Sequence, residues 1–140
     1  MDVANLAYTA GIIDGEGCIG IYAQLRTPKN KKGYQVRVSV NHTNGDLMHW
    51  LARTYGGKVY FEARNNPKWK HRWAWILTGK GVSVFLELIY PYLRLKKAQA
   101  ELALKFQGNR RGKGYPLTED ELNLDKMQRT LMNELNRRGK

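Results

Sequence analysis

The hydrophobic positions of the chain change period after residue 17. Over residues 3–14 apolar side chains recur at spacings of four and three, which predicts a helix with one buried stripe. The stripe consists of Leu6, Ala10 and Ile13. Asp2 is the expected N-cap of this helix, and Gly15 and Gly17 are expected to end it.

Four later segments alternate between apolar and polar residues with a period of two, which predicts four strands. They span residues 18–26, 34–41, 58–64 and about 71–78. Each of the first three has one apolar and one polar, partly basic side. In the fourth strand the facing stays open, because apolar residues occupy both registers: Trp73, Trp75 and Leu77 in one, Ala74 and Ile76 in the other.

Helical periodicity returns in four segments after the second strand. They span residues 45–55, 81–90, 95–107 and 118 to near the end. Thr118 and Glu121 fit a capping box for the last helix. Its apolar stripe consists of Leu124, Met127, Leu131 and Leu135.

The order α-β-β-α-β-β-α-α-α predicts one α+β domain. An antiparallel sheet of four strands turns one face to the helices and leaves the other face open. We expect a core over residues 1–107, a loop over 108–117 and a C-terminal helix over 118–140 of this single domain.

Composition narrows the class of protein. The chain has 140 residues, 42% of them hydrophobic, and 15 aromatic residues, which is enough for one folded domain. The single cysteine, Cys18, excludes a disulfide framework and a Cys-rich zinc site. We find neither a membrane-spanning apolar run nor a signal peptide, so we expect a soluble, intracellular protein without a membrane partner.

The net charge of +12 is concentrated in the middle of the chain. Residues 26–113 carry 19 basic and 4 acidic residues, or +15, whereas residues 1–25 carry −3 and residues 114–140 are neutral. A strongly positive face attracts a polyanion, and nucleic acid is the usual one. The alternative is charge that serves solubility alone.

The first predicted helix carries small residues and two acids. Small side chains on adjoining helical positions allow a second helix to approach closely, although they also suit an ordinary helix beside a bulky neighbour. These positions are Ala7, Ala10, Gly11 and Asp14. Asp14 and Glu16 at the helix end would repel phosphate unless a divalent cation stood between them, which favours a Mg²⁺ site; the alternative is a simple helix end.

The stretch Thr9-Ala10-Gly11-Ile12-Ile13-Asp14-Gly15-Glu16-Gly17 resembles the signature of the LAGLIDADG homing endonucleases. Residues 55–59 (YGGKV) resemble a helix-to-strand junction of that family, and residues 90–96 (YPYLRLK) resemble a later segment that ends in a functional lysine. The three blocks occur in the family's order and cover residues 3–107 together with the predicted elements. The resemblance implies a single-motif endonuclease that acts as a homodimer.

The resemblance also implies roles for the motif residues. Glu16 and the backbone carbonyl of Gly15 would bind divalent metal near the scissile phosphates. Asp14 would serve capping and helix pairing, and is the less favoured metal ligand. Two signature helices would pack together through Ala7, Ala10, Gly11 and Asp14. Mg²⁺ is the implied cofactor, with Mn²⁺ expected to substitute and Ca²⁺ expected to bind without supporting cleavage.

Two further residues receive catalytic roles from the resemblance. Lys96 matches the lysine that stabilises charge at the phosphate. His42 is the closest match to a glutamine that holds the water network, and it could orient or deprotonate water. The basic position that follows in the family falls here at Gly45 or Asp46, which is a departure from the pattern.

The polar sides of the strands and the turns between them are the predicted DNA-binding surface. Side chains on strands can read base edges in the major groove, and lysines in turns can clamp phosphates. The candidates are Tyr22, Gln24, Arg26, Lys29, Lys31, Lys32, Gln35, Arg37, Ser39, Asn41, Lys58, Tyr60, Glu62, Arg64, Lys68, Lys70 and Arg72. A solvated strand surface is the alternative for any single one of them.

The sequence therefore predicts a Mg²⁺-dependent, site-specific endonuclease for double-stranded DNA that acts on a long, partly palindromic site. One alternative is a maturase that binds intron RNA on the same scaffold. Another is a DNA-binding regulator without catalytic activity. Intact Glu16 and Lys96 favour the nuclease, because neither alternative requires them.

Overall fold

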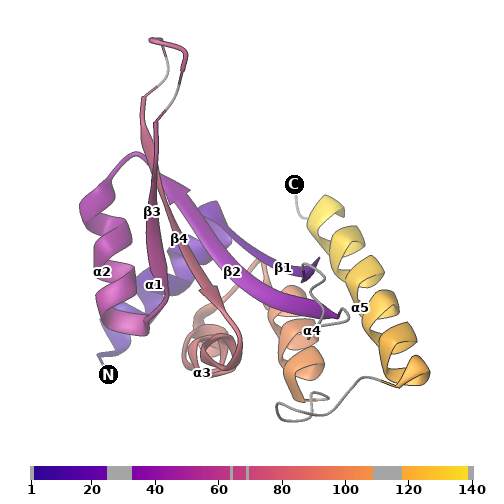
Figure 1. Ribbon diagram of the computed structural model, residues 1–140. Coiled ribbons are helices and arrows are strands. Elements are labelled where there is room, and N and C mark those ends of the chain that lie inside the picture. The colour runs from indigo at the N-terminus through magenta and orange to yellow at the C-terminus, as the bar shows by residue number, and fades with distance from the viewer. Residues whose placement is uncertain (1, 25–32, 64, 69, 109–117, 139–140) are drawn as a thin grey trace.

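The computed structural model describes residues 2–24, 33–63, 65–68, 70–108 and 118–138. The elements follow the predicted order (Figure 1). They are α1 (Val3–Glu16), β1 (Gly17–Ala23), β2 (Tyr34–His42), α2 (Gly45–Tyr55), β3 (Lys58–Glu62), β4 (Arg72–Thr78), α3 (Lys80–Ile89), a short 3-10 helix η1 (Tyr90–Tyr92), α4 (Lys97–Gly108) and α5 (Glu119–Arg138).

The four strands form one antiparallel sheet in the order β1-β2-β4-β3. The α+β class predicted from the sequence is confirmed, including helices on one face of the sheet. Trp75 decides the facing of β4, because its side chain is fully buried on the helix side and its indole N–H donates to the Gly56 carbonyl oxygen at 2.8 Å. Ile76 therefore lies on the open face, opposite the core.

Helices α1 to α4 cover the inner face of the sheet, and their apolar stripes form one core with the inward residues of the strands (Figure 1). In α1 the predicted stripe is buried, with Leu6 8% exposed and Ile13 fully buried. Complete burial of a leucine or isoleucine contributes about 1.5–3 kcal/mol. This stripe therefore anchors α1, and with it the acids at its end.

The predicted helix caps are present. The Asp2 carboxylate accepts a hydrogen bond from the Ala4 N–H at 2.9 Å. Thr118 and Glu121 bond reciprocally to one another's backbone N–H groups at 3.1 and 3.0 Å, as a capping box requires. Helix α1 differs from the prediction at its other end: it continues through Gly15 and ends at Glu16, where the Gly17 N–H bonds to carbonyls of the last turn.

The predicted apolar stripe of α5 is confirmed at Leu135, which packs against the core, and is wrong at its other three positions. Leu124, Met127 and Leu131 are 40%, 69% and 51% exposed, and the helix buries Asp125, Gln128 and Met132 instead. The physical reason is the neighbour that α5 meets. It lies along the edge strand β1, where the Asn136 amide donates to the Ile19 carbonyl oxygen at 2.9 Å (Figure 1). An edge strand presents unpaired backbone groups, so polar side chains are needed there. Among the described residues, we find no helix that is both long and apolar enough to span a membrane.

Candidate active site and nucleic-acid interface

Asp14 is held inside the protomer at the C-terminal end of α1. Its carboxylate accepts three backbone hydrogen bonds, from the N–H groups of Arg94 at 2.7 Å, Leu95 at 3.1 Å and Lys96 at 3.0 Å. These groups lie in the turn that leads into α4. A carboxylate with three donors is a strong structural tie. Asp14 therefore fixes this turn to the end of α1.

Lys96 is brought to the same helix end. Its ammonium donates to the backbone carbonyl oxygen of Asp14 at 2.9 Å, and its side chain is half-buried. A cation at a helix C-terminus interacts favourably with the helix dipole. An ammonium has three donors, and the bond to Asp14 uses one of them. The structure thus places a positive charge at the carbonyl of Asp14, two residues before the last residue of α1.

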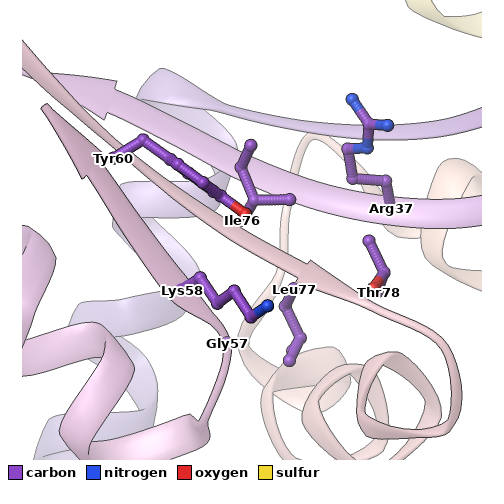
Figure 2. Close-up of a pocket in the computed structure, with 7 residues that line it drawn as sticks. All are labelled: Arg37, Gly57, Lys58, Tyr60, Ile76, Leu77 and Thr78. Atoms are coloured by element: carbon purple, nitrogen blue, oxygen red, sulfur yellow. The ribbon is translucent and has the colours of Figure 1, made fainter. Parts of the chain in front are cut away.

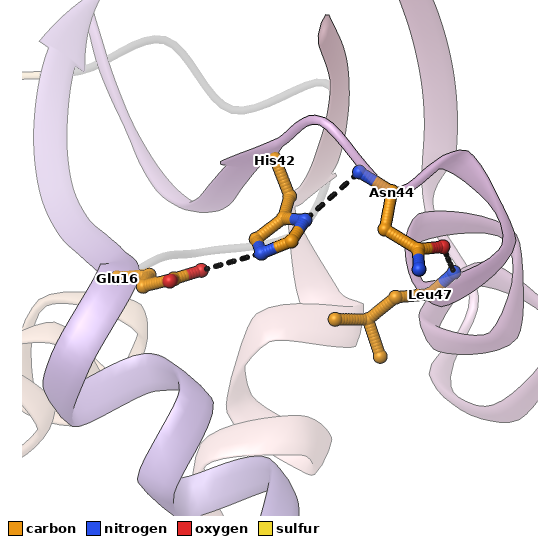
Figure 3. Close-up of polar contacts among 4 residues, drawn as sticks. All are labelled: Glu16, His42, Asn44 and Leu47. Atoms are coloured by element: carbon orange, nitrogen blue, oxygen red, sulfur yellow. Dashed lines mark hydrogen bonds and ion pairs between the residues drawn. The ribbon is translucent and has the colours of Figure 1, made fainter.

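Glu16 lies on the opposite, outer side of the helix end. Its side chain is 52% exposed, and one carboxylate oxygen lies 3.5 Å from Nε2 of His42 (Figure 3). His42 is the last residue of β2 and lies on the side of the sheet that faces α1 and α2. The acid of the signature helix and the histidine at the end of β2, both predicted as site residues, therefore lie side by side.

The hydrogen bonds around His42 define its tautomer. Its Nδ1 accepts from the Asn44 N–H at 2.9 Å, so the ring proton lies on Nε2, facing Glu16. Asn44 in turn caps α2, because its side-chain oxygen accepts from the Leu47 N–H at 3.1 Å (Figure 3). The start of α2 thus positions His42, and His42 positions the Glu16 carboxylate.

One protomer does not supply a complete metal cage. Within the described part of the chain, no three His, Cys, Asp or Glu side chains are grouped to hold an ion. Mg²⁺ does not require such a cage, since it prefers one or two carboxylates together with water and substrate phosphate. The half-exposed Glu16 has the donor chemistry that this mode needs, whereas the carboxylate of Asp14 is committed to backbone N–H groups.

The outer face of α1 is open and partly apolar. Tyr8 is 55% exposed, and no described atom lies within 4 Å of where a Cβ on Gly11 or Gly15 would stand. Ala7 is also exposed on this helix. Ala10 corrects the predicted interface, because it is fully buried in the protomer core. The turn of the helix separates it from Gly11 by about 100°, so it cannot contact a partner across the outer face.

The open face of the sheet carries most of the predicted DNA-binding residues. The register brings them together from all four strands. Tyr22 on β1 pairs with Gln35 on β2, and Ser39 on β2 lies in line with Lys58 on β3, across β4. The others on this face are Arg37 and Asn41 on β2, Tyr60 and Glu62 on β3, and Arg72 on β4. Gln24 follows β1, and Lys68 and Lys70 follow β3. Arg26, Lys29, Lys31, Lys32 and Arg64 lie outside the described residues.

Several of these side chains engage one another. Glu62 forms an ion pair with Arg72 at 2.9 Å, so base readout by Glu62 would compete with this pair. Tyr22 lies along its own strand and its hydroxyl is 3.6 Å from Sγ of Cys18. Burial, and then the hydrogen bond with Cys18, raise the pKa of Tyr22 to about 12, so this hydroxyl stays protonated at neutral pH. The Arg37 guanidinium lies 4.5 Å above the same ring.

A hollow of about 410 Å³ opens on this face between β2, β4 and β3 (Figure 2). It is lined by Arg37, Gly57, Lys58, Tyr60, Ile76, Leu77 and Thr78. The alternation of β4 is compatible with either facing, so it does not predict Ile76 and Thr78 as surface residues. The facing of β4 could have been predicted from Trp75, because a tryptophan side chain has more apolar surface to bury than an isoleucine.

The chain was compared with known proteins. No protein-family model matches it. The DNA endonuclease I-CvuI of Chlorella vulgaris is 31% identical to it over an alignment of 107 residues, which covers 74% of this chain and 64% of that relative. The match thus spans a little less than two thirds of the relative's length.

Solved structures resemble the whole described fold. I-CvuI in complex with its target matches with a TM-score of 0.78 at 23% identity, over 94% of this chain and 82% of that chain. The meganuclease I-SmaMI bound to DNA matches with a TM-score of 0.74 at 15% identity, over 96% and 46% of the two chains. The LAGLIDADG homing endonuclease I-LtrWI, bound to target DNA, gives 0.71 at 17% identity, over 93% and 44%.

The fold is therefore that of the LAGLIDADG homing endonucleases. Together with the signature helix and the relative that matches in sequence, it shows that this chain resembles the members of that family. The resemblance found in the sequence is confirmed.

Proposed function

We propose that this protein is a site-specific endonuclease that cleaves double-stranded DNA with divalent metal, as a homodimer on a long, partly palindromic site. The position of Glu16 carries the proposal. It is a half-exposed carboxylate at the end of a small-residue helix, in a chain with a net charge of +12. An acid at a helix C-terminus is unfavourable for stability. Its exposure there is explained if Glu16 binds a cation.

The relatives support the proposed substrate. I-CvuI is a DNA endonuclease, and I-CvuI, I-SmaMI and I-LtrWI have each been solved with DNA. The basic open face of this chain fits the same ligand, because its arginines, lysines and amides match phosphates and base edges. I-CvuI has been solved in the presence of Ca and of Mg, and in the Mg complex its DNA is not cleaved.

We assign the metal site to Glu16 and the carbonyl of Gly15, completed by water, DNA phosphate and the Glu16 of a second copy. When bound, the ion would supply Lewis-acid stabilisation and make a water more acidic. Mg²⁺ is the proposed cofactor. Mn²⁺ is expected to substitute for it, and Ca²⁺, which takes more ligands in a looser geometry, is expected to bind without supporting cleavage.

Lys96 and His42 have different proposed tasks. Lys96 is held by the Asp14 carbonyl with donors to spare, so it can stabilise negative charge that grows on a phosphate nearby. His42 is a positioning residue, because its Nε2–H points at Glu16 and its Nδ1 is occupied by the Asn44 N–H. It orients the carboxylate rather than accepting a proton itself in this arrangement.

The proposed dimer forms through the outer face of α1. Gly11 and Gly15 are four residues apart on that face and leave room for a second helix to approach until backbones touch. Two copies related by a two-fold axis would bring both Glu16 side chains to the axis. The length of relatives supports this, since the chain covers 44–46% of I-LtrWI and I-SmaMI, about half of each.

The experiment is a cleavage selection from a random library of DNA duplexes with Mg²⁺. We expect a single partly palindromic site to be cut on both strands, and the Glu16→Gln variant to bind this site without cutting it. Mg²⁺ is replaced by Ca²⁺ as a second control. Recovery of bound but uncut duplexes by the wild-type protein would instead support the regulator, and binding of structured RNA in place of duplex DNA would support the maturase.

A further inference from the structure

Ile76 is a large apolar side chain on a surface built mainly of polar and basic residues. Its neighbours in β4, Trp75 and Leu77, face the core, so Ile76 faces outward into the hollow of the open face (Figure 2). In the register of the sheet it lies between Ser39 on β2 and Lys58 on β3. Ile76 is only partly buried there, and the apolar surface that it leaves open among polar and basic residues suggests a ligand contact.

The rim of the hollow carries two cationic side chains besides the hydroxyl groups of Tyr60 and Thr78. Figure 2 shows Arg37 on one side of Ile76 and Lys58 on the other. Neither side chain can accept a hydrogen bond. Arg37 is held over the Tyr22 ring at 4.5 Å, and its buried Nε has no hydrogen-bond partner among the described residues. The hollow therefore offers an apolar floor beside positioned cations.

The chemistry of base edges selects one ligand for such a hollow. In the major groove thymine presents a methyl group beside the O4 acceptor. Guanine, adenine and cytosine present hydrogen-bonding groups in the major groove but no methyl group. Thymine alone combines an apolar group with an acceptor, as the floor and rim require.

We propose that the hollow around Ile76 reads one thymine in each half of the DNA site, with the methyl group against Ile76 and O4 toward a donor of the rim. This inference rests on the proposed function, because it needs duplex DNA on the open face. It adds Ile76 to the residues that determine specificity. The side chain of Ile76 acts there through apolar contact, because it cannot form a hydrogen bond to a base.

The test compares base preferences of the wild-type protein, Ile76→Ala and the control Val84→Ala in the library selection. Val84 is an equally apolar residue, 63% exposed on α3, away from the open face. We expect one position in each half-site at which the wild-type protein prefers thymine by about tenfold or more. Ile76→Ala should lower that preference to about twofold and leave the other positions unchanged, whereas Val84→Ala should change none.

A second arm removes the methyl group from the DNA. Replacing the thymine at this position by deoxyuridine should weaken wild-type binding about fourfold, as expected for one buried methyl group. The same replacement should have no effect on Ile76→Ala. If binding by the wild-type protein does not distinguish deoxyuridine from thymine, the inference is wrong.

Failure of this inference can be told from failure of the proposed function. A recovered site with identical preferences for wild type and Ile76→Ala overturns the reading of thymine and leaves the endonuclease intact. If no duplex is cut, the same comparison is made on duplexes that the protein retains in Ca²⁺, and a thymine preference that depends on Ile76 still supports the inference. If no duplex is retained either, both are overturned.

Discussion

Two carboxylates lie two residues apart at the end of α1, and their surroundings are opposite. Asp14 faces inward and accepts three backbone hydrogen bonds from the turn before α4. Glu16 faces outward, is 52% exposed, and meets the N–H of His42 at 3.5 Å. The hydrogen bonds of Asp14 stabilise the fold, whereas the carboxylate of Glu16 is accessible to a ligand. Chemical type alone therefore does not assign function within this motif; the hydrogen-bond partners do.

The largest expected effect separates activity from stability at Glu16. Glu16→Gln keeps the size of the side chain and removes the charge that would hold the metal. We expect cleavage to fall at least about 10³-fold, equal to about 4 kcal/mol of transition-state stabilisation. The free energy of unfolding should change by less than about 0.5 kcal/mol, because the side chain is half-exposed. Plasmid cleavage in Mg²⁺ and urea unfolding measure the two quantities.

A variant that still nicks its target in Mg²⁺ would refute the assignment of the metal to Glu16. Binding of uncut target in Ca²⁺ serves as the control for a folded protein. Retained binding with lost cleavage is the pattern expected of a residue that acts on the phosphate rather than on the fold.

The reverse pattern is expected at Asp14. Asp14→Ala leaves the backbone N–H groups of Arg94, Leu95 and Lys96 without their charged acceptor. We expect the free energy of unfolding to fall by roughly 2–4 kcal/mol, because hydrogen bonds to a charged group are among the stronger ones. Urea unfolding at neutral pH measures it. The control is Asp46→Ala in the first turn of α2, where an exposed acid contributes only about 0.3–1 kcal/mol.

Equal losses for Asp14→Ala and Asp46→Ala would show that the three hydrogen bonds do not hold the turn. Asp14→Ala should also lower cleavage, because Lys96 would lose its position. This loss should accompany the loss of stability, unlike the effect at Glu16.

The third prediction concerns the outer face of the same helix. A Cβ at Gly11 would have no described atom of the protomer within 4 Å, so Gly11→Leu should leave the protomer folded, or stabilise the helix by up to about 1 kcal/mol. The side chain would hold a second helix away. We expect the dimer to dissociate at least about 100-fold more readily, as measured by sedimentation velocity over a series of concentrations.

Val84→Leu is the matched control, since it enlarges an exposed side chain on α3. An unchanged dimer in Gly11→Leu would place the interface elsewhere. A monomeric wild-type protein would overturn the proposed dimer itself.

Regular periodicity explains how much of the fold was predictable. The order of elements and the core stripe of α1 follow from apolar spacing, since Leu6 and Ile13 are too large to leave exposed. Alanine gives no such signal: Ala10 fits either the core or an interface, and the structure places it in the core. The positions of small residues therefore do not distinguish a helix interface from the core.

The errors arise where a neighbour distant in sequence decides the outcome. The stripe of α5 has the right period for burial, yet the helix buries other positions, and its Asn136 amide donates to the backbone of the edge strand β1. The sequence does not show which element will lie beside a terminal helix. The same holds for the site, where the bond of Asp14 to residues 94–96 spans 80 positions.

The smallest expected effect tests Lys96, whose ammonium donates to the backbone carbonyl of the inner acid, Asp14. Lys96→Met keeps much of the aliphatic stem and removes the ammonium. We expect cleavage at saturating DNA to fall about 10–100-fold, with a loss of about 1 kcal/mol in the free energy of unfolding from the lost bond to the Asp14 carbonyl. Lys96→Arg should recover part of the rate because it restores the charge. Lys97→Met, at the exposed neighbouring position over the Tyr90 ring, is the control and should cut normally. If Lys96→Met loses stability but cuts its target at the wild-type rate, then Lys96 belongs with Asp14 to the fold, and Glu16 acts without a cation from this turn.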